Sequence, residues 1–306
     1  MKRVIFICAT SLLFGSDTLS ILDKYHEAIS DWVILKSDEI DRYLSKKNDN
    51  KILSKTVIGI EYTVGYDTKK SFSNNIDFSF GIDLPRFKNK LHLMAESIKY
   101  DLKNLKTEPP KLFQKENEKR SYNIALEYNK IKNKKLKFSF TGGVRFDKIL
   151  IEPYIGVIAK YKLKKVSNWD NTFQNKFIFY TSGEVSDIVS LENLYPLDKN
   201  SLIGIYNSIG LNSSSEYQSL GSEVSYYHQI NNSSYYKVGG QIDGSLKNLI
   251  DPKVNRYKLY AQYKNNIANR DWLYYRVTPS IAWKREHNFK PSYRMDLTLG
   301  IKFGRR

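Results

Sequence analysis

The sequence predicts an all-β fold: a transmembrane, up-and-down antiparallel β-barrel of about fourteen strands, preceded by an amphipathic helix. Three observations predict it. From about residue 53 to the end, apolar and polar residues alternate with a period of two. Charged residues occupy many of the polar positions. Short polar clusters suited to hairpin turns divide this region into runs of about ten residues; they are KNKK near 132, SGE near 182, LDKN near 197 and NNSS near 231.

The first residues are typical of a secretory signal peptide. Lys2 and Arg3 precede the apolar run VIFICATSLLF, and the small residues GS follow. We therefore expect residues 1–16 to be a cleaved signal, residues 17–52 to form a helix with its linker, and residues 53–306 to form the barrel. The only cysteine lies in the leader, so the mature chain has no thiol for disulfides, metal binding or nucleophilic catalysis.

Residues 22–44 have a different periodicity. Apolar residues recur there at steps of three and four, which predicts an amphipathic helix. Acidic residues between them give the helix a negative face that could lie against basic lumen residues as a plug. A helix at the periplasmic rim is the other interpretation, and both stay open. The acidic residues are Asp23, Glu27, Asp31, Asp38, Glu39 and Asp41.

In the strand region, apolar residues occupy every second position, as in the series from Ile58 to Val64, from Ile76 to Ile82 and from Tyr293 to Phe303. Charges inside a small soluble sandwich would be buried without partners, whereas charges facing a water-filled lumen cost little. The alternation therefore favours a barrel in lipid. It must close, because an open edge in hydrocarbon leaves backbone groups unpaired. An even count of about fourteen strands, with twelve or sixteen left open, returns both ends to the periplasm.

The charged residues between the apolar positions form the candidate site, since they would line the pore. Acids are frequent early in the strand region and bases later, so we expect walls of opposite sign and a mild preference for anions. For any single charge, pairing with a neighbouring strand is the simpler interpretation. The pore-lining candidates are Glu61, Asp77, Glu127, Lys137, Arg145, Lys160, Lys258, Arg276, Arg294 and Lys302.

Together these features resemble a bacterial outer-membrane β-barrel protein, and in particular uncharacterised porin-like members of that class. The ending is similar to the assembly signal of the class, in which a glycine precedes alternating apolar residues and a near-terminal aromatic: here Gly300, Ile301 and Phe303, followed by GRR where the usual chain ends on the aromatic. The resemblance implies location in the bacterial outer membrane, contact with the lipid bilayer and lipopolysaccharide, and insertion by the outer-membrane assembly machinery through the last strand.

A barrel of about fourteen strands is too wide for its own side chains to fill, so we expect a porin-like channel for passive diffusion of small solutes. A structural or adhesive barrel is the alternative, and a barrel hydrolase is a weaker one. His228 lies near Ser233 and Ser234, but no pattern of nucleophile and base on adjacent strands is evident. We expect no enzyme activity, cofactor, metal site or nucleic-acid binding. Self-association of barrels is left open.

Overall fold

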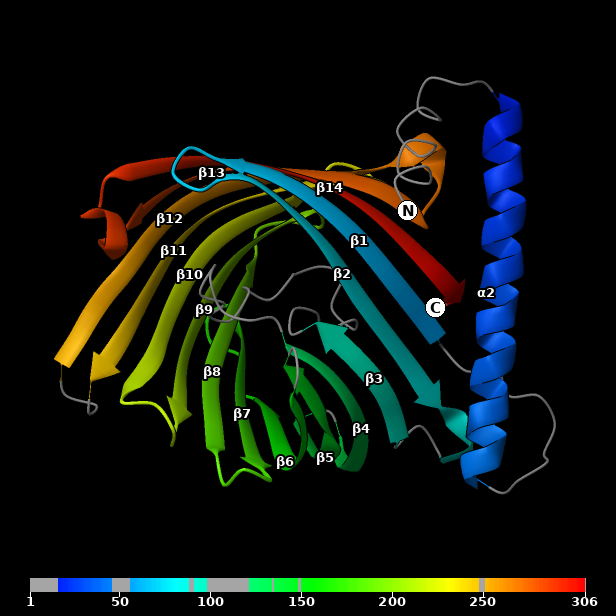
Figure 1. Cartoon of the computed structure of the whole chain (residues 1–306), viewed down its shortest axis with the longest axis horizontal. Coiled ribbons are helices and arrows are strands. Elements are labelled where there is room, and N and C mark those ends of the chain that lie inside the picture. The colour runs from blue at the N-terminus through cyan, green and yellow to red at the C-terminus, as the bar shows by residue number, and fades with distance from the viewer. Residues whose placement is uncertain are drawn as a thin grey trace.

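The computed structural model describes residues 16–45, 56–87, 91–97, 121–133, 135–147, 150–247 and 251–305. Within these ranges the chain forms one long helix and fourteen strands that close into a barrel (Figure 1). The predicted fourteen-stranded antiparallel barrel with an amino-terminal helix is therefore confirmed. The expected signal peptide, the linker after the helix and the polar loop at 100–119 lie outside the described residues.

Each strand pairs antiparallel with its neighbours in chain order, and the fourteen form an up-and-down meander. Valine, isoleucine, tyrosine and phenylalanine are frequent in them, and these residues favour a pleated surface. The strands are β1 (Thr56–Asp67), β2 (Ser71–Leu84), β3 (Leu91–Ser97), β4 (Ser121–Lys132), β5 (Leu136–Asp147), β6 (Leu150–Lys162), β7 (Asp170–Tyr180), β8 (Val185–Pro196), β9 (Ser201–Asn212), β10 (Tyr217–Gln229), β11 (Ser234–Lys247), β12 (Asp251–Asn266), β13 (Leu273–Lys284) and β14 (Pro291–Arg305).

The barrel closes where the first strand meets the last. β1 and β14 pair in unbroken antiparallel register, with Ile60 opposite Ile301 and Tyr62 opposite Leu299. We call this pairing the seam. β1 begins and β14 ends at the same end of the barrel, the terminal end, and the opposite end is the distal end. Closure gives every strand a hydrogen-bonded neighbour on both sides, as a wall in hydrocarbon requires.

Short polar turns join several strands at the terminal end, as the sequence predicts. The carboxylate of Asp198 accepts the backbone N–H groups of Asn200 and Ser201, at 2.7 Å each. The side-chain oxygen of Asn231 accepts those of Ser233 and Ser234, at 2.8 and 2.9 Å. Asparagine and aspartate favour tight turns because their side chains bond the backbone two or three residues ahead. These turns therefore fix where the β8–β9 and β10–β11 hairpins reverse.

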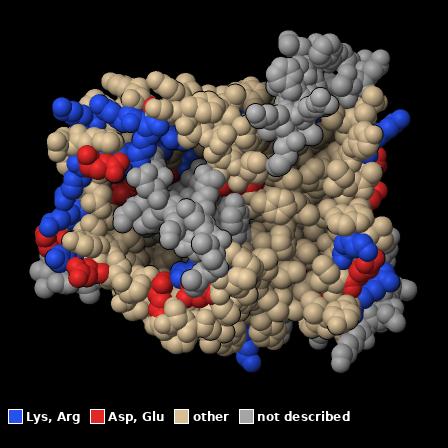
Figure 2. All heavy atoms as spheres, viewed as in Figure 1, with Lys and Arg blue, Asp and Glu red and all other residues tan. Residues whose placement is uncertain are grey.

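The two faces of the wall differ in chemistry. Large apolar side chains point outward and stay exposed, such as Phe140 at 47%, Ile155 at 67% and Leu297 at 53%. The alternate positions point into the barrel and carry polar and charged groups, among them Glu61 and Arg276. Figure 2 shows a broad uncharged surface on the barrel, with charged groups gathered toward its edges. This distribution is typical of a barrel that crosses a membrane.

The lumen side has an apolar cluster of its own. Ala125, Tyr154, Ile178 and Tyr180 pack together on the inner faces of β4, β6 and β7 and are each less than 9% exposed. The interior therefore combines an aromatic section with charged sections, so it is not a uniformly hydrated tube.

The helix, α2 (Ser16–Ser45), covers the predicted amphipathic segment. It lies at the terminal end, beside the ends of β14, β1 and β2, and not inside the lumen (Figure 1). Near its start, Asp23 pairs with Arg270 of the β12–β13 connection at 2.5 Å. Near its end, Asp38 and Asp41 pair with Arg86, which follows β2, at 2.8 and 2.9 Å. No helix in the described residues is long and apolar enough to cross a membrane.

The ion pairs of α2 are reflected in pKa values. Hydrogen bonds from Arg270 lower the pKa of Asp23. Burial alone would raise the pKa of Asp38, but hydrogen bonds from Arg86 and Arg42 outweigh it, so this pKa lies below its usual range. The side chain of Arg86 is only 1% exposed, and its pKa is raised, mainly by the hydrogen bond to Asp38. Docking of α2 therefore depends on ionised carboxylates.

Candidate functional site: the charged lumen wall

The strand register places all ten candidate residues on the lumen side of the wall. Each lies at a position that alternates with the outward apolar series of its strand. They are spread around the barrel, on β1, β2, β4, β5, β6, β12, β13 and β14. No single cluster gathers them. The lumen wall as a whole, and not a compact pocket, is therefore the candidate site.

The first group of charges lies beside the seam. The carboxylate of Glu61 on β1 accepts hydrogen bonds from Arg276 of β13 at 2.8 Å and from the hydroxyl of Tyr274 at 2.5 Å. Both charged side chains are at most 10% exposed. The Tyr274 ring lies against Gly300 of β14, where any side chain would collide with it. This cluster links three strands across the closure of the barrel.

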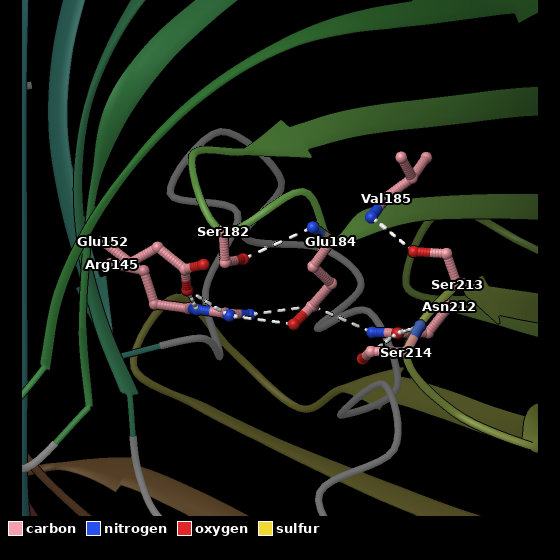
Figure 3. A network of polar contacts seen from close by, with 8 residues as sticks. All are labelled: Arg145, Glu152, Ser182, Glu184, Val185, Asn212, Ser213 and Ser214. Carbon is pink, nitrogen blue, oxygen red and sulfur yellow. Dashed lines mark hydrogen bonds and ion pairs between the residues drawn. The ribbon is translucent and has the colours of Figure 1, made fainter.

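A second group lies at the distal mouth (Figure 3). Arg145 of β5 donates to Glu152 of β6 at 2.9 Å and to Glu184 of the β7–β8 turn at 3.2 Å. Asn212, at the end of β9, donates to Glu184 at 2.9 Å. The guanidinium also lies 3.9 Å from the ring centre of Tyr180. Five successive strands are thus connected through one arginine and one glutamate.

Three of the other charged candidates also have close partners of opposite sign. Glu127 pairs with Lys137 at 2.5 Å, and Arg294 pairs with Asp296 at 2.8 Å. Asp77 accepts a hydrogen bond from Asn75. Outside the predicted set, Lys237 pairs with Glu223 at 2.8 Å and Arg256 donates to Asp243 at 2.5 Å. Local pairing of this kind cancels much of the transverse field that walls of opposite sign would otherwise create.

Lysines in excess of acids gather on one part of the wall. Lys160 lies directly opposite Lys137 in the β5–β6 pairing, and Lys162 and Lys176 lie on the inner faces of β6 and β7. Among the described residues, Lys160, Lys162 and Lys176 have no carboxylate within 4.0 Å. We call Lys137, Lys160, Lys162 and Lys176 the lysine wall. A water-filled lumen beside it carries a positive potential.

A second basic section lies across the β12–β14 part of the lumen. The ammonium of Lys264 lies 4.0 Å from the ring centre of Tyr274, and that of Lys302 lies 4.9 Å from the same ring. Lys258 occupies the same inward series of β12. Lys264 was not among the predicted residues, although it continues the alternation that contains Lys258. Cation–π interactions with the ring of Tyr274 keep these two ammonium groups close to the wall.

His228 does not pair with the serines that follow it in the sequence. His228 is on the outward face of β10, and its Nδ1 shares a 2.8 Å hydrogen bond with Ser201, not with the two serines suggested by the sequence. Asp198 bonds the backbone of the same turn and does not orient the imidazole. In the described ranges, no group of three His, Cys, Asp or Glu residues could hold a metal ion.

Comparisons with known proteins address the architecture. This chain is a fourteen-stranded closed β-barrel. No family model matches it, and no curated protein matches it. Its resemblance to outer-membrane barrels, drawn from the sequence, is confirmed at the level of fold.

Similar solved structures are bacterial outer-membrane proteins and channels. OmpT of Vibrio cholerae is 6% identical, with 84% of this chain and 100% of that chain covered and a TM-score of 0.46. The outer membrane channel DcaP of Acinetobacter baumannii is 6% identical, with 82% and 97% covered and a TM-score of 0.48. OprD of Pseudomonas aeruginosa is 8% identical, with 82% and 95% covered and a TM-score of 0.45. Likenesses of this size say nothing about solute, reaction or partner.

Proposed function

We propose that the protein is a bacterial outer-membrane channel that passes small hydrophilic solutes by diffusion, with a mild preference for anions. Under this proposal the leader is removed on export, both termini face the periplasm, and the outward apolar band contacts lipid. The lumen gives solutes a path because a barrel of this strand number exceeds what inward side chains fill completely. Binding of lipopolysaccharide and insertion by the assembly machinery stay predictions of the same proposal.

The lysine wall is the observation that carries the anion preference. Several lumen charges form close pairs of opposite sign, so these pairs contribute little net field. Lys160, Lys162 and Lys176 have no carboxylate within 4.0 Å among the described residues; Lys160 and Lys162 lie near the terminal end of β6, and Lys176 lies near the middle of β7. A local excess of positive charge in a confined, hydrated space raises the concentration of anions and lowers that of cations.

Swelling of proteoliposomes tests the proposal with three solutes of nearly equal size: glucose, gluconate and glucosamine. We expect all three to enter, with gluconate faster than glucosamine. The variant Lys160→Glu with Lys176→Glu should reverse that order. A matched control, Lys164→Glu with Lys199→Glu, changes the net charge equally at exposed positions outside the strands and should keep it.

The possible outcomes test the anion preference and the channel activity separately. Equal rates for gluconate and glucosamine would contradict the anion preference and leave the channel standing. Exclusion of glucose by barrels that are folded, as judged by heat-modifiable gel mobility, would contradict the channel itself. Reversal by the control variant as well would mean that overall charge, and not the lysine wall, governs the preference.

A further inference from the structure

The outer side of α2 carries a continuous apolar stripe. Five large side chains follow one another at steps of three and four residues, so they share one face of the helix. They are also well exposed. The stripe consists of Ile21 at 52%, Tyr25 at 66%, Ile29 at 43%, Trp32 at 59% and Leu35 at 53% exposed.

The helix docks on the barrel largely through a different face. Asp23 and Asp41 lie on that face and form the ion pairs at its two ends. Between them, Ser30 accepts the backbone N–H of Gly304 at 3.1 Å, and His26 donates to the carbonyl of Lys302 at 2.8 Å. The apolar stripe is therefore not needed to hold the helix in place, and its exposure requires another explanation.

The side chains beneath α2 show on which side of the wall it lies. Thr56, Ile82 and Leu84 belong to the outward series of β1 and β2 by their alternation with the residues of the lumen face. They are nevertheless only 0%, 8% and 0% exposed, whereas Phe78, farther along β2, is 43% exposed. Because α2 contacts β1 and β2 and pairs with Arg86, two residues after Leu84, it covers the outer surface of the wall at this end. Its stripe consequently lies on the side that faces lipid.

The direction of α2 also fits a membrane surface. Its ion pairs to the barrel begin at the β12–β13 connection and end at Arg86 after β2, and between them the helix contacts β14 and β1. Asp23 and Asp41 are separated by about 27 Å at 1.5 Å per residue. The helix thus crosses the strand ends along the rim and does not follow the strands (Figure 1). A helix with this orientation lies parallel to the bilayer plane.

Aromatic rings on the docking face join α2 to the outward surface of the barrel. The His26 ring stacks on Trp272, with 4.1 Å between ring centres, and on Phe303, the last outward aromatic of β14, at 5.4 Å. Trp32 and Tyr25 have the amphipathic rings that favour the region between lipid headgroups and acyl chains. The apolar surface of the wall therefore extends onto α2.

We propose that α2 is an interfacial helix whose stripe inserts into the lipid monolayer at the terminal end of the barrel. Its polar side binds the rim of the barrel and its apolar side inserts into the membrane. The helix therefore anchors the seam at the lipid surface. Lipid is the occupant that the geometry favours, because the stripe is on the outer side of the wall and continuous with its apolar surface.

Nitroxide scanning of the full chain tests this proposal. With Cys8→Ser as background, single labels are attached at Ile29→Cys and Trp32→Cys on the stripe, and at Glu27→Cys as an exposed control on the other side of the helix. The proteins are placed in vesicles of phosphatidylethanolamine and phosphatidylglycerol. Collision rates with oxygen, which concentrates in lipid, and with a water-soluble nickel chelate are then compared. Heat-modifiable gel mobility confirms that each variant is folded.

We expect the ratio of oxygen to nickel collisions to be several-fold higher for both stripe labels than for the label at Glu27→Cys. Equal ratios, with all three labels open to nickel, would place the stripe in water and overturn the proposal. Protection of the stripe labels from both reagents would also overturn it, because the stripe would then be covered by protein and not by lipid.

Discussion

Leu297 and Thr278 lie close together near the middle of the wall but face opposite sides. Leu297 points outward and is 53% exposed, in register with Val277, while Thr278 points inward, opposite Asp296. We expect Leu297→Arg to cost about 2–4 kcal/mol of unfolding free energy in lipid, because its charge would enter hydrocarbon. Thr278→Arg should cost less than about 1 kcal/mol, since its charge enters the lumen beside a carboxylate. Denaturant titration in vesicles measures both, and equal costs would contradict the assigned facing.

Glu61 is a residue on which the seam depends. Replacing it with alanine leaves the guanidinium of Arg276, 5% exposed, without this carboxylate, and leaves Tyr274 without its acceptor. We expect Glu61→Ala to reduce the unfolding free energy by about 2–3 kcal/mol, less than a fully dry pair would lose because lumen water is close.

The matched control removes both charges. Glu61→Ala combined with Arg276→Leu should recover part of the loss, since the guanidinium that lost this carboxylate is removed as well. A single-variant cost below about 0.5 kcal/mol, the size of an ordinary surface change, would contradict the importance of the pair.

Single residues also show what the sequence could predict about the site. The inward placement of Arg145 follows from alternation along one strand, and so does that of the other nine candidates. Its partners do not follow from alternation. Glu184 belongs to a turn 39 residues farther along the chain, and only the register of three hairpins brings it to Arg145. Pairing of a single charge with a neighbouring strand was the simpler interpretation of the sequence, but the identity of each partner could not be predicted for the same reason.

At the scale of the element, α2 should respond to acid. Asp23 and Asp38 have pKa values lowered in the folded protein. A lowered carboxyl pKa stabilises docking above the ordinary pKa of aspartate, about 3.9, and this contribution is lost as pH falls through the lowered value. A nitroxide at Glu27→Cys should therefore be immobile at neutral pH and at about pH 5, and become mobile only below about pH 3.9.

Asn substitution supplies the control for this acid response. Asp38→Asn removes one carboxylate from the buried Arg86, so the label should be more mobile at neutral pH and change less on acidification. Mobility that is constant down to about pH 2, or that increases on raising the pH instead, would contradict ion-pair docking.

The helix was predictable as an element, but its docking was not. Three- and four-residue spacing identifies an amphipathic segment, and α2 contains all of it. The sequence suggested that an acidic face would meet basic lumen residues. Asp23, Asp38 and Asp41 do meet arginines, but Arg270 and Arg86 lie at the rim, outside the strands. In the sequence, Arg270 and Arg86 look like ordinary basic residues in turns. Only closure of the barrel brings both of them to the terminal end, where α2 can bind them.

For the whole molecule, the architecture was the most predictable feature. Period-two alternation, polar turns such as LDKN and the need to close in hydrocarbon together predict an even-stranded meander. The pairing of the last strand with the first follows from closure alone. Features that depend on exact register, such as the aromatic cluster around Tyr154 and the lysine wall, require the three-dimensional structure.

Single-channel recording of the refolded mature protein in a planar bilayer tests the central claim most directly. We predict stable unitary conductance steps, with a reversal potential in a salt gradient that indicates anion preference. A variant lacking residues 17–48 should show the same unitary conductance, because α2 lies outside the lumen. Silence from folded barrels would contradict the channel, and conductance that appears only after the deletion would contradict the position of the helix.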